Sequence, residues 1–112
     1  MNQTVAIKQP HLFRRAYAKG KSAVTPTVVL YARKNGQSFN RLGLTVGTKV
    51  GKAVVRNRVR RRIREAYRIH EEKMAPGWDI VVVARVRSAF APYREVQRDL
   101  LRLLDKLGVY RR

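Results

Sequence analysis

The residues with the clearest capacity for chemistry form a cationic run from Lys49 to Arg64. Eight basic side chains are interspersed there with apolar ones, and the first acidic residue of the chain is Glu65. Clustered like charges repel and cannot be buried without partners, so these groups must face solvent or a polyanion. A mixed run of Lys and Glu would indicate a solvated surface, but a run of one sign predicts contact with nucleic acid.

The same run predicts an amphipathic helix from about residue 52 to residue 72. At about 100° per residue, one arc of its surface is apolar and the rest is cationic. The apolar arc holds Val55, Val59, Ile63, Ala66, Tyr67 and His70. The cationic remainder holds Arg56, Arg58, Arg60, Arg61, Arg62, Arg64 and Arg68. An apolar arc of this width requires a core behind it.

The other reactive residue types do not form a catalytic set. His11 and His70 are the only histidines, neither has a neighbour at metal-ligand spacing, and there is no cysteine. We interpret His11 as a surface residue and His70 as a residue at the edge of the core. Glu71 and Glu72 are interpreted as a solvated pair, and Asp79 as the start of a strand. We therefore expect no catalytic residue and no metal site in this chain.

Composition favours one folded, RNA- or DNA-binding domain over residues 1–112. The hydrophobic fraction is 45%, which argues against a disordered basic tail. The formal net charge is +19, from 26 Lys and Arg against 7 Asp and Glu. At this charge the compact state repels itself, so we expect marginal stability at low salt and stabilisation by polyanions.

Cellular location is inferred from what the sequence lacks. No apolar run approaches the length of a membrane span, and the first residues lack the apolar segment of a secretory signal. The absence of cysteine suits a reducing compartment. We expect a cytoplasmic protein without a membrane partner.

The first half of the chain predicts a helix followed by two strands. Pro10 fits the start of the helix and Gly20 its end, with residues 21–26 as a loop. Residues 27–33 predict a strand, because they are rich in β-branched and aromatic side chains. A turn at 35–36 leads through 37–40, which could add a small strand, to a second strand at 41–47. In that strand Leu42, Leu44 and Val46 alternate with Gly43, Thr45 and Gly47, so the small residues would leave one face open to another molecule.

The second half predicts a strand and a helix after the basic helix. Residues 79–85 form the most hydrophobic segment and are expected to be the central strand. Pro92 opens a last helix that Gly108 ends. Its apolar stripe consists of Val96, Leu100, Leu103, Leu104 and Leu107. The order α-β-β-α-β-α, with the small extra strand optional, predicts an α+β fold built as a sandwich in one domain.

Aromatic residues leave the class of nucleic-acid partner open. Phe13 and Tyr17 share a helix face with Ala16, and spacing alone favours a core role for both rings. On an exposed surface with Tyr31 they could instead stack unpaired bases, at about 1–3 kcal/mol per base. Asn57 could instead read a base edge in the major groove of duplex DNA. The major groove of A-form RNA is too narrow to be read in this way. A structural RNA-binding protein of the ribosomal type is a further alternative.

The segment from Leu42 to Tyr67 resembles the signature of the bacterial ribonuclease P protein subunit. Its core, A-V-V-R-N-R-V-R-R-R-I-R-E at 53–65, follows the family pattern R-N-[RK]-x-[KR]-R-x-[IL]-R-E. Phe13 and Tyr17, just before Gly20, are similar to the aromatic pair of the family's first helix. The strands at 29–31 and 79–85 are similar to its first and last strands, so the resemblance covers nearly the whole chain.

This resemblance implies a fold, a reaction and partners. The fold would be an α-β sandwich whose mixed sheet contains a left-handed β-α-β crossover through the basic helix, against the usual right-handed preference. The partners would be a catalytic RNA and precursor tRNA, whose 5′ leader the holoenzyme removes as an endonuclease. The RNA would hold the active-site Mg²⁺, and the protein would carry out no covalent chemistry.

The resemblance also implies two groups of site residues. The candidate RNA-binding residues are Lys49, Lys52, Arg56, Asn57, Arg58, Arg60, Arg61, Arg62, Arg64 and Arg68. The leader would bind in a cleft between the first helix and the sheet, lined by Phe13, Tyr17, Tyr31, Lys49 and the start of the basic helix. Phe13 and Tyr17 would then be partly exposed rather than core. Thr48 stands where the family often has a lysine, and Lys52 is the candidate to replace it.

Overall fold

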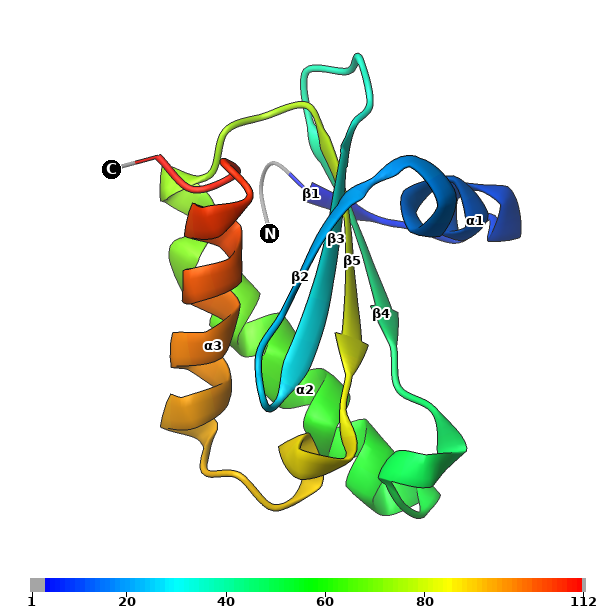
Figure 1. Ribbon diagram of the computed structural model, residues 1–112, viewed down its shortest axis with the longest axis vertical. Helices are drawn as coiled ribbons and strands as arrows, with labels where there is room; N and C mark the ends of the chain where they lie inside the picture. Colours follow the sequence, from blue (N-terminus) through cyan, green and yellow to red (C-terminus); the bar gives the residue numbers. More distant parts are fainter. Residues whose placement is uncertain (1–3, 112) are drawn as a thin grey trace.

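The computed structural model describes residues 4–111 as a five-stranded mixed sheet with helices on both faces (Figure 1). In chain order the elements are β1 (Thr4–Ala6), α1 (Pro10–Lys19), β2 (Lys21–Val24), β3 (Val28–Lys34), β4 (Asn40–Thr45), η1 (Thr48–Val50), α2 (Ala53–His70), η2 (Glu71–Lys73), β5 (Trp78–Ala84), η3 (Val86–Ala89) and α3 (Tyr93–Lys106). The three η elements are short 3₁₀ turns. The α+β sandwich is confirmed.

The strand order is β1-β4-β5-β3-β2, which puts the most hydrophobic strand, β5, at the centre as predicted. β5 is antiparallel to β3 and parallel to β4. Parallel neighbours need a crossover, and α2 supplies it between β4 and β5. The basic helix therefore follows β4 and leads through η2 to the central strand β5.

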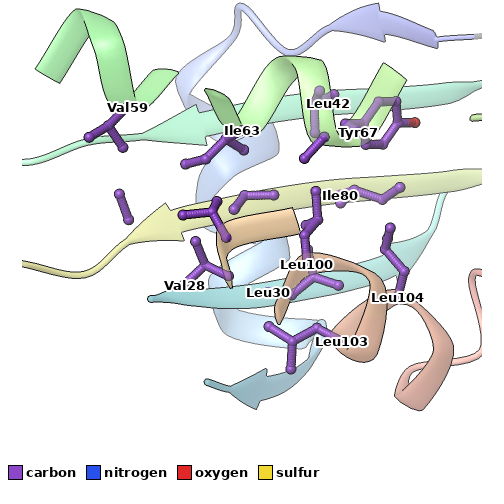
Figure 2. Packing of buried hydrophobic residues seen from close by; sticks show 14 of the residues in the cluster. Val28, Leu30, Leu42, Val59, Ile63, Tyr67, Ile80, Leu100, Leu103 and Leu104 are labelled. Atoms are coloured by element: carbon purple, nitrogen blue, oxygen red, sulfur yellow. The ribbon is translucent and has the colours of Figure 1, made fainter. Parts of the chain in front are cut away.

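One face of the sheet is covered by α2 and α3, and the main core lies there. Alternate residues of β3 and β5 point to this side, and they pack against the apolar stripes of both helices (Figure 2). Fully buried members include Val28, Leu30, Val59, Ile63, Tyr67, Ile80, Val82, Leu100, Leu103 and Leu104. The stripes predicted for the basic helix and the last helix are thereby confirmed, with Val55 and Leu107 partly buried at their ends.

The other face carries α1 alone, over a smaller cluster. Leu12 and Ala16 of α1 are buried against Ile7 and Val81, with aromatic side chains around them. The chain leaves β1 at one edge of the sheet and reaches β2 at the other edge, so α1 crosses the strands between them. Part of each strand's length therefore stays outside the cover of α1.

Two predictions about the edges are wrong. Residues 21–24 are not a loop but the edge strand β2, antiparallel to β3, in which Ala23 lies opposite Leu30. Its single buried side chain gives too short an alternation to recognise. Residues 37–40 form no separate strand, because Asn40 already belongs to β4. The additional strand is β1, three residues parallel to β4.

β1 is held to the core by a buried polar contact. The hydroxyls of Thr4 and Tyr67 lie 2.8 Å apart, and burial raises the pKa of Tyr67 to about 12. Glu71, expected to be solvated, is only 8% exposed, because the chain turns inward through η2 after α2. Glu72 is exposed as predicted. Within residues 4–111 no helix is long and apolar enough to cross a membrane.

Candidate nucleic-acid interface

The basic helix α2 begins after a sharp turn at Gly51, whose φ of 155° favours glycine. Arg56 reaches back to this turn, and its Nε donates a hydrogen bond to the Gly51 carbonyl at 3.1 Å. Lys52 at the N-cap is exposed. The first turn of α2 is therefore organised by one of its own arginines while a lysine faces solvent.

Two arginines of α2 bind the protein itself. The Nη2 of Arg58 donates to the carbonyl of Ala89, and the Nη1 of Arg62 donates to the carbonyl of Ala91, both at 3.1 Å. Both acceptors lie in the segment that joins β5 to α3. These side chains are partly buried and hold that segment against α2, a role that their place in the cationic run did not reveal.

Other members of the run are partly neutralised or turned toward one another. Arg60 donates to Oδ1 of Asn57 at 3.0 Å. Arg68 forms an ion pair with Glu65 at 2.6 Å, and this hydrogen bond lowers the pKa of the Glu65 carboxyl and raises that of the guanidinium. The contact at Asn57 leaves its amide nitrogen as the group able to donate to another molecule.

Arg61 and Arg64 are the members of α2 that are most available to a polyanion. Both are exposed, and within residues 4–111 neither makes a hydrogen bond or ion pair to the protein. With Glu65 and Arg68 they line a surface hollow of about 460 Å³. The structure thus divides the predicted cationic face into side chains that brace the fold and side chains that can bind phosphate.

The three predicted aromatic residues come together on the α1 face. The ring centroids of Phe13 and Tyr17 are 6.5 Å apart, and those of Tyr17 and Tyr31 are 4.9 Å apart in an edge-to-face arrangement. The Tyr17 hydroxyl lies 2.8 Å from that of Thr45 on β4. Tyr17 is 40% exposed, while Phe13 and Tyr31 are half-buried, so a pure core role is wrong.

The small residues of β4 do not leave the backbone open at Gly43. A Cβ atom placed there would lie 2.6 Å from the Phe13 ring, so that ring occupies the space that the sequence suggested for another molecule. Farther along the strand the sheet is uncovered. Thr45, Val83, Val29 and Val24 are paired in one row across four strands, and Val24 is 60% exposed.

A groove of about 560 Å³ continues from this open row. It runs between the ends of β4 and β5, and its lining includes Thr45, Lys49, Val83, Arg85 and Arg87. Thr45 connects it to the aromatic cluster through Tyr17. The groove thus joins rings to cations, as a single-stranded nucleic acid requires for its bases and phosphates.

Sequence reasoning missed two cations of this groove. Arg85 donates to the Thr25 carbonyl at 2.9 Å, and Arg87 pairs with Glu95 at 3.2 Å. Both follow the central strand directly, so the register of β5 against β4 brings them to Lys49. In the sequence, their position just after a predicted buried strand could have indicated them, because residues of the loops that follow strands often form binding sites.

At the opposite end of α1 the aromatic cluster meets the basic helix. A pocket of about 230 Å³ lies at the edge of the sheet where β1 ends beside β4, and its lining includes Phe13, Ile7, Arg60 and Arg64. The two groups of predicted site residues are therefore neighbours around one edge of the sheet. Phe13 belongs both to the aromatic cluster and to the pocket that Arg60 and Arg64 line.

No arrangement for acid–base or metal chemistry is found among residues 4–111. No group of three or more His, Cys, Asp or Glu side chains could hold a metal ion there. His11 is exposed, and His70 stacks edge-on against Tyr110 with ring centroids 5.9 Å apart. Burial lowers the pKa of His70, which disfavours its charged form.

Comparison with known proteins identifies the family of this chain. The sequence model of the family described as Ribonuclease P matches residues 1–108. The chain belongs to the ribonuclease P protein family. Membership makes it a protein component of ribonuclease P, the complex that processes tRNA, with the ribonuclease P RNA as partner. The alternative of a ribosomal-type protein is not favoured.

Relatives of this family match over nearly their full length. A "Ribonuclease P protein component" of Clostridioides difficile is 41% identical over 109 residues, covering 96% of each chain. One from Clostridium botulinum is 44% identical over 105 residues, covering 93% of this chain and 95% of the relative.

Solved structures of ribonuclease P proteins share the fold. That of Staphylococcus aureus superposes with a TM-score of 0.86 at 33% identity, covering 94% of this chain and 96% of the other. That of Thermotoga maritima gives 0.82 at 32% identity, covering 90% and 96%. The mixed sheet and three helices described above are thus the ribonuclease P protein fold.

Proposed function

We propose that the chain uses the two sides of its β4 edge for two RNA partners. The exposed cations of α2, led by Arg61 and Arg64, bind the catalytic RNA of ribonuclease P. The groove on the α1 face binds the single-stranded 5′ leader of precursor tRNA. In this way the holoenzyme distinguishes precursor from mature tRNA when it cuts the leader.

The observation that carries this proposal is the continuity between rings and cations on the α1 face. Tyr17 contacts both the Tyr31 ring and Thr45, and Thr45 lines the groove that also holds Lys49 and Arg87. Unpaired bases can stack on partly exposed rings while arginine and lysine neutralise the phosphates. A duplex hides its base faces, so this surface favours a single strand.

We further propose that the RNA, not a protein side chain, carries the catalysis. The two fully buried carboxylates of the described chain, Asp79 and Asp99, are engaged in the fold. Asp79 pairs with Arg41 at 2.6 Å, and Asp99 accepts a hydrogen bond from Thr27 at 2.6 Å. Mg²⁺ bound by the RNA would activate the attacking water and stabilise the leaving oxygen. The protein's cations would lessen the magnesium requirement by neutralising phosphates.

We also propose that the protein acts in the cytoplasm. The supporting features are the cysteine-free sequence and the described helices, none of which could span a membrane. Fractionation of cells that express a tagged chain tests the location, and recovery with the membrane fraction would contradict it.

Reconstitution tests the function. A bacterial ribonuclease P RNA is assayed at low magnesium with and without the protein, and precursor and mature tRNA are titrated. We expect cleavage to depend on the protein and precursor binding to tighten as the leader lengthens. An RNA that cuts equally well without the chain would contradict the proposal, and efficient competition by duplex DNA would favour the reading of DNA through Asn57.

Substitution of the rings tests the groove. Phe13→Ala or Tyr17→Ala should weaken precursor binding by about 1–3 kcal/mol, because one stacked base is lost, and should spare mature tRNA. Val5→Ala is the control, since Val5 is also an exposed apolar residue but has no ring on which a base could stack. Equal losses for precursor and mature tRNA would exclude leader stacking.

A further inference from the structure

Phe90 is the most exposed large apolar side chain among residues 4–111, at 81%. It lies between η3 and α3, and its two neighbours in the chain, Ala89 and Ala91, are buried. Single exposed apolar residues are common on protein surfaces. The buried neighbours of Phe90, however, fix the backbone that carries the ring, which a residue in a mobile loop lacks.

The backbone around Phe90 is held from several sides. Its own N–H and that of Ala91 both donate to the Arg87 carbonyl at 3.0 Å. Arg58 and Arg62 of α2 bind the carbonyls of Ala89 and Ala91 at 3.1 Å, one on each side of the ring. Two arginines of the basic helix therefore brace the segment that presents Phe90.

The surroundings of the ring favour a nucleic-acid base over an apolar protein partner. Phe90 follows η3, which packs beside α2 (Figure 1). The segment that carries the ring therefore adjoins the cationic helix, two of whose arginines bond the residues on either side of Phe90. Arg94 is also exposed just beyond it. An apolar protein partner would have to desolvate these cations, whereas an RNA supplies phosphates for them and a π-face for the ring.

The position of Phe90 separates it from the leader groove. Val86 and Arg87 of the same segment line that groove, but Phe90 does not. Its braces come from α2, the helix assigned to the catalytic RNA. We propose that Phe90 stacks on an unpaired base of the ribonuclease P RNA, next to the phosphates bound by α2. This inference rests on the proposed function and adds one aromatic contact to it.

Binding to the RNA alone, without tRNA, tests the contact. Phe90→Ala should raise the Kd for a bacterial ribonuclease P RNA by about 5- to 150-fold, the range expected for one stacked base. Phe90→Trp should keep the affinity, and Phe90→Leu should lose it as alanine does, because leucine is apolar but has no π-face. The salt dependence of binding should stay unchanged, since no charge is altered.

Chemical probing of the RNA identifies the base. One unpaired nucleotide should be protected by the wild-type protein and by Phe90→Trp, and it should become reactive with Phe90→Ala. Equal melting temperatures would show that the variants fold, as expected for an exposed side chain. Leader-length dependence should be the same in all of them.

The outcomes separate this inference from the proposed function. If the wild-type protein activates the RNA and Phe90→Ala binds the RNA as tightly as the wild type does, the stacking is overturned and the proposed function stands. Phe90→Leu with wild-type affinity would overturn it too, because apolar contact would then suffice. Wild-type protein that does not bind the RNA would overturn both.

The braces give a second, independent readout. If Arg58 acts partly by positioning Phe90, the effects of Arg58→Ala and Phe90→Ala should be non-additive in a double-mutant cycle. Arg61 is the matched control on the same helix, because it is exposed and makes no contact with that segment. Additive effects in both cycles would remove the positioning role of Arg58.

Discussion

The two faces of the sheet differ in how completely they are covered. On the α2/α3 face, Val28, Leu30, Ile80 and Val82 are all fully buried. On the α1 face only part of each strand is covered, and the row that ends at Val24 is open to solvent. The first face stabilises the fold, and the second leaves part of the same strands uncovered, where we propose that the leader binds.

The difference follows from the dimensions of the helices. Two helices of 18 and 14 residues cover the first face, whereas α1 has ten residues and crosses the strands (Figure 1). A helix is about 10 Å wide, and a seven-residue strand is about 23 Å long. One crossing helix therefore leaves about half of the strand length uncovered, and the groove lies there.

The largest effect should come from the covered face. Ile63→Ala removes a fully buried side chain and should lower the free energy of unfolding by about 2–5 kcal/mol. Tyr17→Ala on the other face should lower it by about 1–2 kcal/mol, because that ring is 40% exposed and loses only its contacts with Tyr31 and Thr45. Urea unfolding of both variants in the same buffer checks the contrast, and equal losses would refute it.

Polyanions should stabilise the fold through the charged surface rather than through either face of the sheet. With +19 net charge, binding of sulfate to the native state at about 100 times its Kd should add about 2.7 kcal/mol. Thermal melts with sodium sulfate and with sodium chloride at matched ionic strength measure this. Identical melting temperatures in the two salts would show that screening alone is responsible.

Gly43→Ala should disturb the α1 face selectively. The new Cβ would displace the Phe13 ring, with an expected loss of about 1–3 kcal/mol in stability and weaker precursor binding. Gly47→Ala is the control for stability only, since its Cβ would meet no protein atom within 4 Å but would stand in the groove lining. If both variants bind precursor like the wild type, the position of Phe13 does not matter to the groove.

The smallest expected effect is a difference between two arginines of α2 in the salt dependence of RNA binding. Arg61→Ala should lower the slope of log K against log salt by about one unit, because one phosphate contact is lost. Arg68→Ala should change it less, since Glu65 already pairs with that guanidinium. Titration of ribonuclease P RNA at several salt concentrations measures both slopes. Equal slopes would mean that the ion pair opens when RNA binds.

The long periodic elements could be predicted from the sequence, and the short edges could not. α2, α3 and β5 each carry enough apolar residues at one spacing to identify type and extent within about two residues. β1 and β2 have three and four residues, and their stability comes from pairing with β4 and β3. Pairing partners distant in sequence leave no local pattern.

The sequence alone determined that this chain is a basic RNA-binding protein of the ribonuclease P family. The basic composition and the motif follow from the order of the residues, so they can be recognised without knowledge of the fold. Only the tertiary structure decided which cations remain available, because Arg58 and Arg62 reach carbonyls about thirty residues away. The same reason explains why the places of Arg85 and Arg87 in the groove, and the exposure of Phe90, became visible only in the packed structure.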